Sequence, residues 1–248
     1  SANPEDDRAL AEGISESGRV FLESILDNSS FGDTIDEEMF ARQLPLIEKA
    51  GSPRIVGGRW REMTPSVGLQ TNLWDLNEAV RGSGVANVVA DETGGVVRRQ
   101  PLVFKYSRYV GDITIDDLDS SFEIDEDSHE RLSWFDTSGR DHLVDLPLSE
   151  AALADLRQTL YEKAPPLLHD ADGDGTADDE TRVLTVYRDH FMPSIAFSLA
   201  LDYWGTSFRE CEVYPGEKIV VRKPDGSSLS IPVDGDCEML INFAGPAS

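Results

Sequence analysis

The segment from His169 to Glu180 has the residue types and spacing of a calcium-binding loop. Counted from Asp170, aspartates stand at the first, third and fifth positions and a glycine at the sixth. This spacing places carboxylate oxygens on the inside of a tight turn. Hard oxygen ligands of this kind suit Ca²⁺. The predicted ligands are Asp170, Asp172, Asp174, the backbone carbonyl of Thr176, and Asp178 directly or through water.

The twelfth position of this loop lacks the usual bidentate glutamate, because Thr181 stands there. Closure of the metal shell therefore falls to Glu180, to Asp179 or to a remote carboxylate, as in the short calcium repeats of exported proteins. We expect a structural Ca²⁺ that neutralises carboxylates which otherwise repel one another. The alternative is a glycine-rich acidic turn that binds no metal.

Arg98 and Arg99 form a second candidate site, at the expected start of a strand. Guanidinium groups can bind an anionic ligand through paired hydrogen bonds. They can equally form ion pairs with the surplus of acidic side chains. The sequence leaves both interpretations open.

Two cysteines occur, Cys211 and Cys237, each beside a predicted C-terminal strand. A disulfide between them would close a loop of about 26 residues and contribute roughly 3 kcal/mol in the chain-entropy model. Two buried free thiols are the alternative.

Catalytic patterns are weak in this sequence. The four histidines lack metal-ligand spacing, and Asp189, His190 and Ser194 lie too close together to indicate a hydrolase triad. We therefore expect a chain that is not itself an enzyme.

The elements that must position these residues alternate between helical and strand patterns over residues 1–110. This alternation predicts a mixed α/β fold, with a central mixed sheet flanked by helices. Apolar residues on both sides of Gly94-Gly95 predict a hairpin, with one strand at 85–90 and a second from Val96. Expected helices begin at Asp6, near Asp36 and near Asn72.

Beyond residue 190 a short helix and a set of strands are predicted. Pro193 can occupy a first helical turn, Ile195, Leu199 and Tyr203 form an apolar stripe, and Gly205 ends the helix. The alternating segments 218–222 and 229–233, followed by a strand from Met239, predict a small meander on the same sheet.

Residues 111–181 form an acidic insertion that contains the calcium-type loop. The part from Gly111 to Glu130 is rich in Asp, Glu and Ser and predicts an extended surface loop. A helix follows, capped by Ser149 and ended by Pro165-Pro166. The chain therefore divides into a first part of a core, 1–110, the insertion, 111–181, and a second part of the core, 182–248.

Several segments, taken in order, are similar to the second type of CHASE domain, the cyclases/histidine kinases associated sensory extracellular domain. The individual motifs are degenerate, and their order and spacing carry the resemblance. The segments that carry the resemblance are Asp6 to Leu22, Arg54 to Pro65, Asn72, Gly84 to Asn87, Asp91 to Pro101, Pro193 to Gly205, and Ile231-Pro232-Val233 to Pro246.

The resemblance implies the ligand-sensing domain of a transmembrane receptor, incomplete at both ends, with an adenylate or guanylate cyclase or a histidine kinase as output. It also implies an extracytoplasmic location (periplasmic or extracellular), a small-molecule or protein signal and a homodimer. The alternative from another class is a calcium-stabilised exported adhesion or carbohydrate-binding module.

Composition limits the partners. The formal net charge of −25 disfavours nucleic acid and anionic lipid, because phosphates would be repelled. A hydrophobic content of 40% is enough for a sizeable core, and no run of about 18 apolar residues predicts a membrane span.

Overall fold

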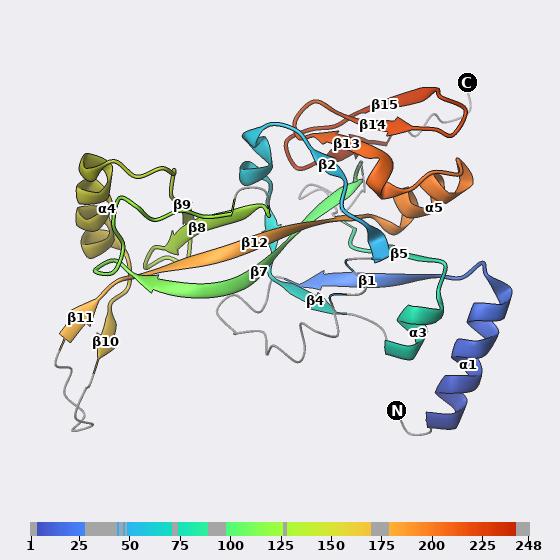
Figure 1. Cartoon of the computed structure of the whole chain (residues 1–248), viewed down its shortest axis with the longest axis horizontal. Helices are drawn as coiled ribbons and strands as arrows, with labels where there is room; N and C mark the ends of the chain where they lie inside the picture. Colours follow the sequence, from blue (N-terminus) through green and yellow to red (C-terminus); the bar gives the residue numbers. More distant parts are fainter. Residues whose placement is uncertain are drawn as a thin grey trace. The chain divides into compact units, whose positions relative to one another are not determined.

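The computed structural model describes residues 4–27, 44, 47, 49–70, 74–88, 98–125, 128–169 and 179–241 (Figure 1). They form two compact units, one containing the chain up to Tyr106 together with the chain from His190, the other containing Ser107–Asp189. The predicted mixed fold class is confirmed, with helices and with parallel and antiparallel strands divided among several sheets. The insertion expected at 111–181 lies within the second unit.

The first unit contains a three-stranded sheet with β1 (Phe21–Asp27) at its centre. β1 pairs in parallel with β5 (Gly82–Val85) and antiparallel with β4 (Gly68–Gln70). The chain reaches β5 through α3 (Trp74–Ala79), which contacts α1 (Pro4–Ser17) (Figure 1). β1 and β5 also contact the helix at Ile195–Tyr203, which lies more than 100 residues later in the chain.

The hairpin expected around Gly94-Gly95 is wrong for the described residues. β5 pairs with β1, whereas β6 (Arg99–Pro101) pairs antiparallel with β16 (Glu238–Leu240) in a separate two-stranded ribbon. The predicted meander is wrong in its last strand, because β16 pairs with β6 and does not join the sheet of the other two strands. Apolar alternation indicates which face of a strand is buried but does not select the neighbouring strand. Residues 89–97 lie outside the described part of the chain.

A four-stranded sheet of order β15-β14-β13-β2 completes the C-terminal part of the first unit. The antiparallel pair predicted at 218–222 and 229–233 is confirmed as β14 and β15. Val213, Ile219 and Val221 are fully buried in the core beneath this sheet. The strands are β2 (Arg54–Ile55), β13 (Cys211–Tyr214), which follows the short helix η2 (Phe208–Glu210), β14 (Lys218–Arg222) and β15 (Ser228–Pro232).

Helix α5 (Ile195–Tyr203) is confirmed, although Pro193 precedes it as the last residue of β12 (Val183–Pro193). Ser194 caps the helix by accepting a hydrogen bond from the backbone N–H of Phe197. The predicted stripe is wrong: Phe197 and Leu201 are buried, while Leu199 and Tyr203 are 48% and 86% exposed. Because the helix is apolar on several sides, four-residue spacing alone does not identify the buried face.

The junction of α5 with β5 joins segments more than 100 residues apart. Ser194 forms a parallel bridge with Val85, and the hydroxyl of Ser198 donates to the carbonyl of Ser83 at 2.7 Å. The backbone N–H of Ser194 donates to the carbonyl of Leu102 at 2.9 Å. The two parts of the chain therefore share one interior within the first unit.

The second unit contains the parts of two long strands that lie within Ser107–Asp189. These strands are β7 (Val103–Thr114) and β12 (Val183–Pro193). There β12 pairs with β8 (Glu130–Phe135), which pairs with β9 (Asp141–Leu143). Helix α4 (Glu150–Lys163) is confirmed, with the Ser149 hydroxyl accepting from the N–H of Ala152.

The surface loop expected over 111–130 is wrong in its first part. β7 extends to Thr114, and Ile115 and Leu118 are fully buried with Leu132 and Leu160. These apolar residues have no regular spacing, so neither a helix nor a strand pattern marked them as core.

Candidate ligand-binding site

The predicted calcium loop lies between two paired strands. β10 (Leu167–His169) and β11 (Asp179–Thr181) pair antiparallel, with His169 opposite Asp179. Five predicted ligands, Asp170, Asp172, Asp174, Thr176 and Asp178, lie outside the described residues. Glu180 is described, and its carboxylate lies 2.6 Å from a guanidinium nitrogen of Arg182. Calcium binding here stays a prediction.

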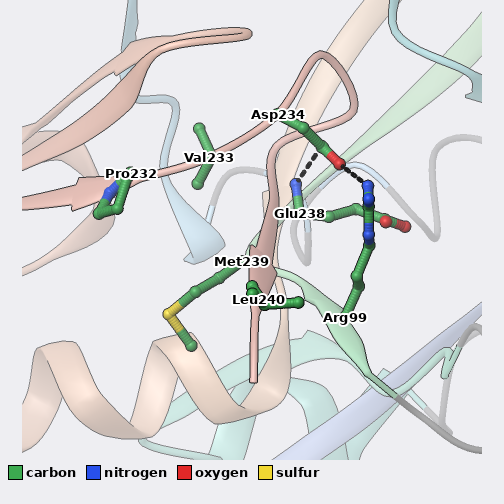
Figure 2. Close-up of a pocket in the computed structure, with 7 residues that line it drawn as sticks. All are labelled: Arg99, Pro232, Val233, Asp234, Glu238, Met239 and Leu240. Atoms are coloured by element: carbon green, nitrogen blue, oxygen red, sulfur yellow. Dashed lines mark hydrogen bonds and ion pairs between the residues drawn. The ribbon is translucent and has the colours of Figure 1, made fainter. Parts of the chain in front are cut away.

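The two candidate arginines differ in what they contact. Arg98 is exposed, and its backbone carbonyl accepts from the N–H of Ile241 at 2.8 Å. The guanidinium of Arg99 lies 2.6 Å from the Asp234 carboxylate, so the ion-pair interpretation applies to Arg99 (Figure 2).

Asp234 begins an acidic turn, Asp234–Glu238, which is called the 234–238 turn below. One carboxylate oxygen of Asp234 accepts from the backbone N–H of Asp236 at 3.2 Å. The same oxygen accepts from the backbone N–H of Glu238 at 2.9 Å, and the other oxygen accepts from Arg99 (Figure 2). Cys237 has φ +57°, which is uncommon for a residue with a side chain. The turn is also held by backbone bonds, from the N–H of Cys237 to the carbonyl of Asp234 at 3.0 Å and from the N–H of Asp234 to the carbonyl of Glu238 at 3.1 Å. The carboxylate and these bonds together hold a compact and locally strained turn.

A first hollow of about 320 Å³, the Arg99 hollow, lies beside the ion pair. Figure 2 shows Arg99 and Asp234 together, with the Met239 side chain extending away from them. The hollow therefore has a charged and an apolar wall. It is lined by Arg99, Pro232, Val233, Asp234, Glu238, Met239 and Leu240.

A second hollow of about 390 Å³, the Lys105 hollow, lies elsewhere in the first unit and shares Glu238 with the Arg99 hollow. Its volume falls within the range of small-molecule sites, which is about 300–1,000 Å³. Its walls mix polar and apolar groups from widely separated segments. They are Leu26, Met63, Thr64, Ser66, Asn87, Pro101, Val103, Phe104, Lys105, Asp236 and Glu238.

The polar walls of the Lys105 hollow are fixed by hydrogen bonds. Lys105 is 2% exposed, and its ammonium donates to the carbonyls of Trp60 and Arg61 at 3.1 Å each. Those carbonyls belong to the short helix η1 (Gly58–Glu62), and β3 (Pro65–Ser66) pairs with β7 at Lys105. Burial of a lysine requires such partners, so its position is well defined.

Two further groups of the lining are also held by hydrogen bonds. The Asn87 amide bonds both backbone groups of Leu26, accepting from its N–H and donating to its carbonyl at 2.7 Å each. The Asp236 carboxylate accepts from the N–H of Thr64 at 2.6 Å. The sequence prediction missed Lys105 and Asn87, although a lone lysine inside the apolar run from Leu102 to Tyr106 was an available signal.

Cys211 and Cys237 are free thiols in this structure, which matches the second of the two alternatives. The Cys211 thiol donates to the carbonyl of Ser207, and the Cys237 sulfur lies 3.9 Å from the Met63 sulfur. Burial raises the pKa of each thiol to about 12. Both are therefore poorly reactive while the surrounding structure is closed.

Two residues of the Asp189, His190 and Ser194 trio have evident structural roles. The Asp189 carboxylate accepts from the Ser107 hydroxyl at 2.5 Å and from Arg131 at 3.3 Å, all three being buried. The Ser194 hydroxyl caps α5. His190 stacks on Tyr106 with ring centroids 6.2 Å apart.

Comparison with known proteins found no matching family, no matching curated protein and no matching solved structure. Among the helices in the described ranges, none is long and apolar enough to cross a lipid bilayer.

Proposed function

We propose that this chain is a non-catalytic ligand-sensing domain, and that the Lys105 hollow is its ligand site. In this proposal the domain is the extracytoplasmic part of a transmembrane receptor of the cyclase or histidine kinase type. The ordered segments that resemble the second type of CHASE domain support the receptor class. The hollow supports the binding function.

One observation carries the proposal: residues distant in sequence converge on one preorganised hollow. Leu26, Ser66, Asn87, Lys105 and Asp236 all line it. Buried Lys105 and the doubly bonded Asn87 are held before any ligand arrives, so little conformational entropy is lost on binding. A packed core alone does not require a buried lysine and a half-buried amide beside an open volume.

Sensing in this proposal is a population shift. A ligand that contacts the walls more favourably in one arrangement of the first unit increases the population of that arrangement. The shift is limited by the difference in affinity between the two arrangements. A small polar molecule fits the volume and the mixed lining, while the calcium-type loop would add a separate, structural Ca²⁺.

Thermal melting of the chain with millimolar amino acids, dicarboxylates, diamines and monosaccharides tests the binding function. A ligand at a hundredfold excess over its dissociation constant adds about 2.7 kcal/mol to the free energy of unfolding. For a chain of this size that corresponds to a rise in melting temperature of roughly 5–10 °C.

Ser66→Phe would fill the hollow and should abolish the rise, while Ser230→Phe, on exposed β15, is the matched control and should retain it. The proposal fails if no compound of the panel raises the melting temperature. It fails equally if the rise persists in Ser66→Phe.

A further inference from the structure

The Arg99–Asp234 ion pair closes the 234–238 turn from the solvent side. The two side chains are 55% and 37% exposed and lie 2.6 Å apart. A partly exposed pair of this kind contributes modestly and can open without disrupting a core. We infer that the 234–238 turn is a latch on the wall of the Lys105 hollow, which opens locally when this ion pair breaks.

The position of the turn makes its movement consequential. Asp236 and Glu238 line the Lys105 hollow, and Asp234 and Glu238 line the Arg99 hollow. The Asp236 carboxylate is anchored by the backbone N–H of Thr64, another residue of the lining, which donates to it at 2.6 Å. Displacement of the turn therefore changes the lining of both hollows at once.

The backbone of the turn favours release. Cys237 is held at φ +57°, a conformation that its side chain disfavours, by the bond from the N–H of Leu102 to its carbonyl at 3.0 Å. Packing of its thiol against Met63 opposes release. Backbone strain at Cys237 thus favours opening of the turn, while burial of its thiol favours the closed arrangement. The Arg99–Asp234 ion pair also stabilises the closed arrangement.

The attachment of the turn to the rest of the unit is short. β16 has three residues and pairs with β6 at Glu238, Met239 and Leu240. Cys237 is buried in the core, and the carbonyl of Asp234 also accepts from the N–H of Gly216 at 2.8 Å. A two-stranded ribbon with so short a ladder still opens at a lower free energy than a longer sheet does. The turn can therefore open while the four-stranded sheet stays folded.

The purpose of the latch rests on the proposed function, because admission or retention of a ligand matters only if the hollow binds one. Opening itself does not depend on a ligand. It exposes Cys237, whereas Cys211, at the start of β13, stays in the core. The two buried thiols therefore report separately on local and global opening.

The test is timed labelling of the native, ligand-free chain with N-ethylmaleimide, with both thiols quantified by peptide mass spectrometry. Arg99→Gln should accelerate labelling of Cys237 about two- to fivefold, the range that a partly exposed ion pair provides. Asp234→Ala also removes the bonds to Asp236 and Glu238 and should accelerate it about tenfold or more. Labelling of Cys211 should not change.

Arg81→Gln is the matched control, because Arg81 and Asp202 also lie 2.7 Å apart with side chains 49% and 36% exposed. It should leave Cys237 unchanged. Unchanged Cys237 labelling in both Arg99→Gln and Asp234→Ala overturns the latch, as does equal acceleration of Cys211 and Cys237. If no compound of the melting panel binds but Cys237 is still labelled selectively in the two variants, the proposed function is rejected and the latch is retained.

Discussion

Gly84→Ala should destabilise the first unit, because the added methyl group has no space at the β5–α5 junction. A Cβ at Gly84 would lie 2.6 Å from Cα and 2.7 Å from N of Ile195, and 2.8 Å from the carbonyl carbon of Ser194. All three are backbone atoms, so a rotamer change cannot relieve the contact. β5 and the start of α5 must separate.

The expected loss in the free energy of unfolding is about 1–3 kcal/mol. Overpacking of a core costs roughly 1–3 kcal/mol. Separation also weakens the bond from Ser198 to Ser83, worth about 1 kcal/mol. Against this, alanine reduces the entropy of the unfolded chain and restores about 0.4–1 kcal/mol.

The assay is urea denaturation followed by pulse labelling of Cys211, which belongs to the first unit and therefore reports that unit. Gly13→Ala, within α1, is the control, because its Cβ meets no atom within 4 Å. Helix propensity predicts a gain of about 0.5–1 kcal/mol for it where the helix is folded. If the two variants shift the urea midpoint in the same direction and to the same extent, the close packing inferred at Gly84 is wrong.

Three further predictions concern other groups. Asn87→Ala should lower the free energy of unfolding, measured in urea, by about 2–3 kcal/mol, because the backbone of Leu26 loses two hydrogen bonds. Asn87→Asp should lower it more, because a carboxylate oxygen then faces the Leu26 carbonyl. Bonds from the Ser138 hydroxyl and from His142 hold the pKa of Asp136 below its ordinary value. The stability that the Asp136 carboxylate contributes is therefore complete above about pH 4 and is lost as pH falls through the folded pKa. Asp136→Asn should flatten the acid limb of an unfolding titration followed by tryptophan fluorescence. Calcium should raise the calorimetric melting temperature relative to a chelator, and less so in Asp172→Asn; an unchanged midpoint in the parent chain would exclude the metal site.

Elements whose ends are determined by local chemistry could be predicted from the sequence. Ser149 precedes α4 and caps it through the expected hydroxyl, and Gly205 has φ +68° where α5 ends. β14 and β15 also follow from local signals, a four-residue turn between two alternating segments. In each case the deciding interaction spans only a few residues.

Partners distant in sequence could not be predicted in the same way. Nothing local to β1 indicates that β5 lies beside it, and nothing local to Arg99 indicates Asp234, 135 residues later. Whether Arg99 faces a ligand or a carboxylate depends on where the chain returns, which the sequence around Arg99 does not indicate. The same limit hid Lys105, because its two acceptors are backbone carbonyls, which every residue carries.

The Lys105 hollow is lined by segments that are far apart in the sequence. A hollow built from β1, β3, β7 and the 234–238 turn exists only when both parts of the first unit are folded together. Its ligand would therefore bind the assembled core and not any single segment, and binding free energy would be coupled directly to the packing of the parts. Such coupling is what a sensor requires, because a ligand can change the arrangement of a domain only through contacts that differ between its arrangements.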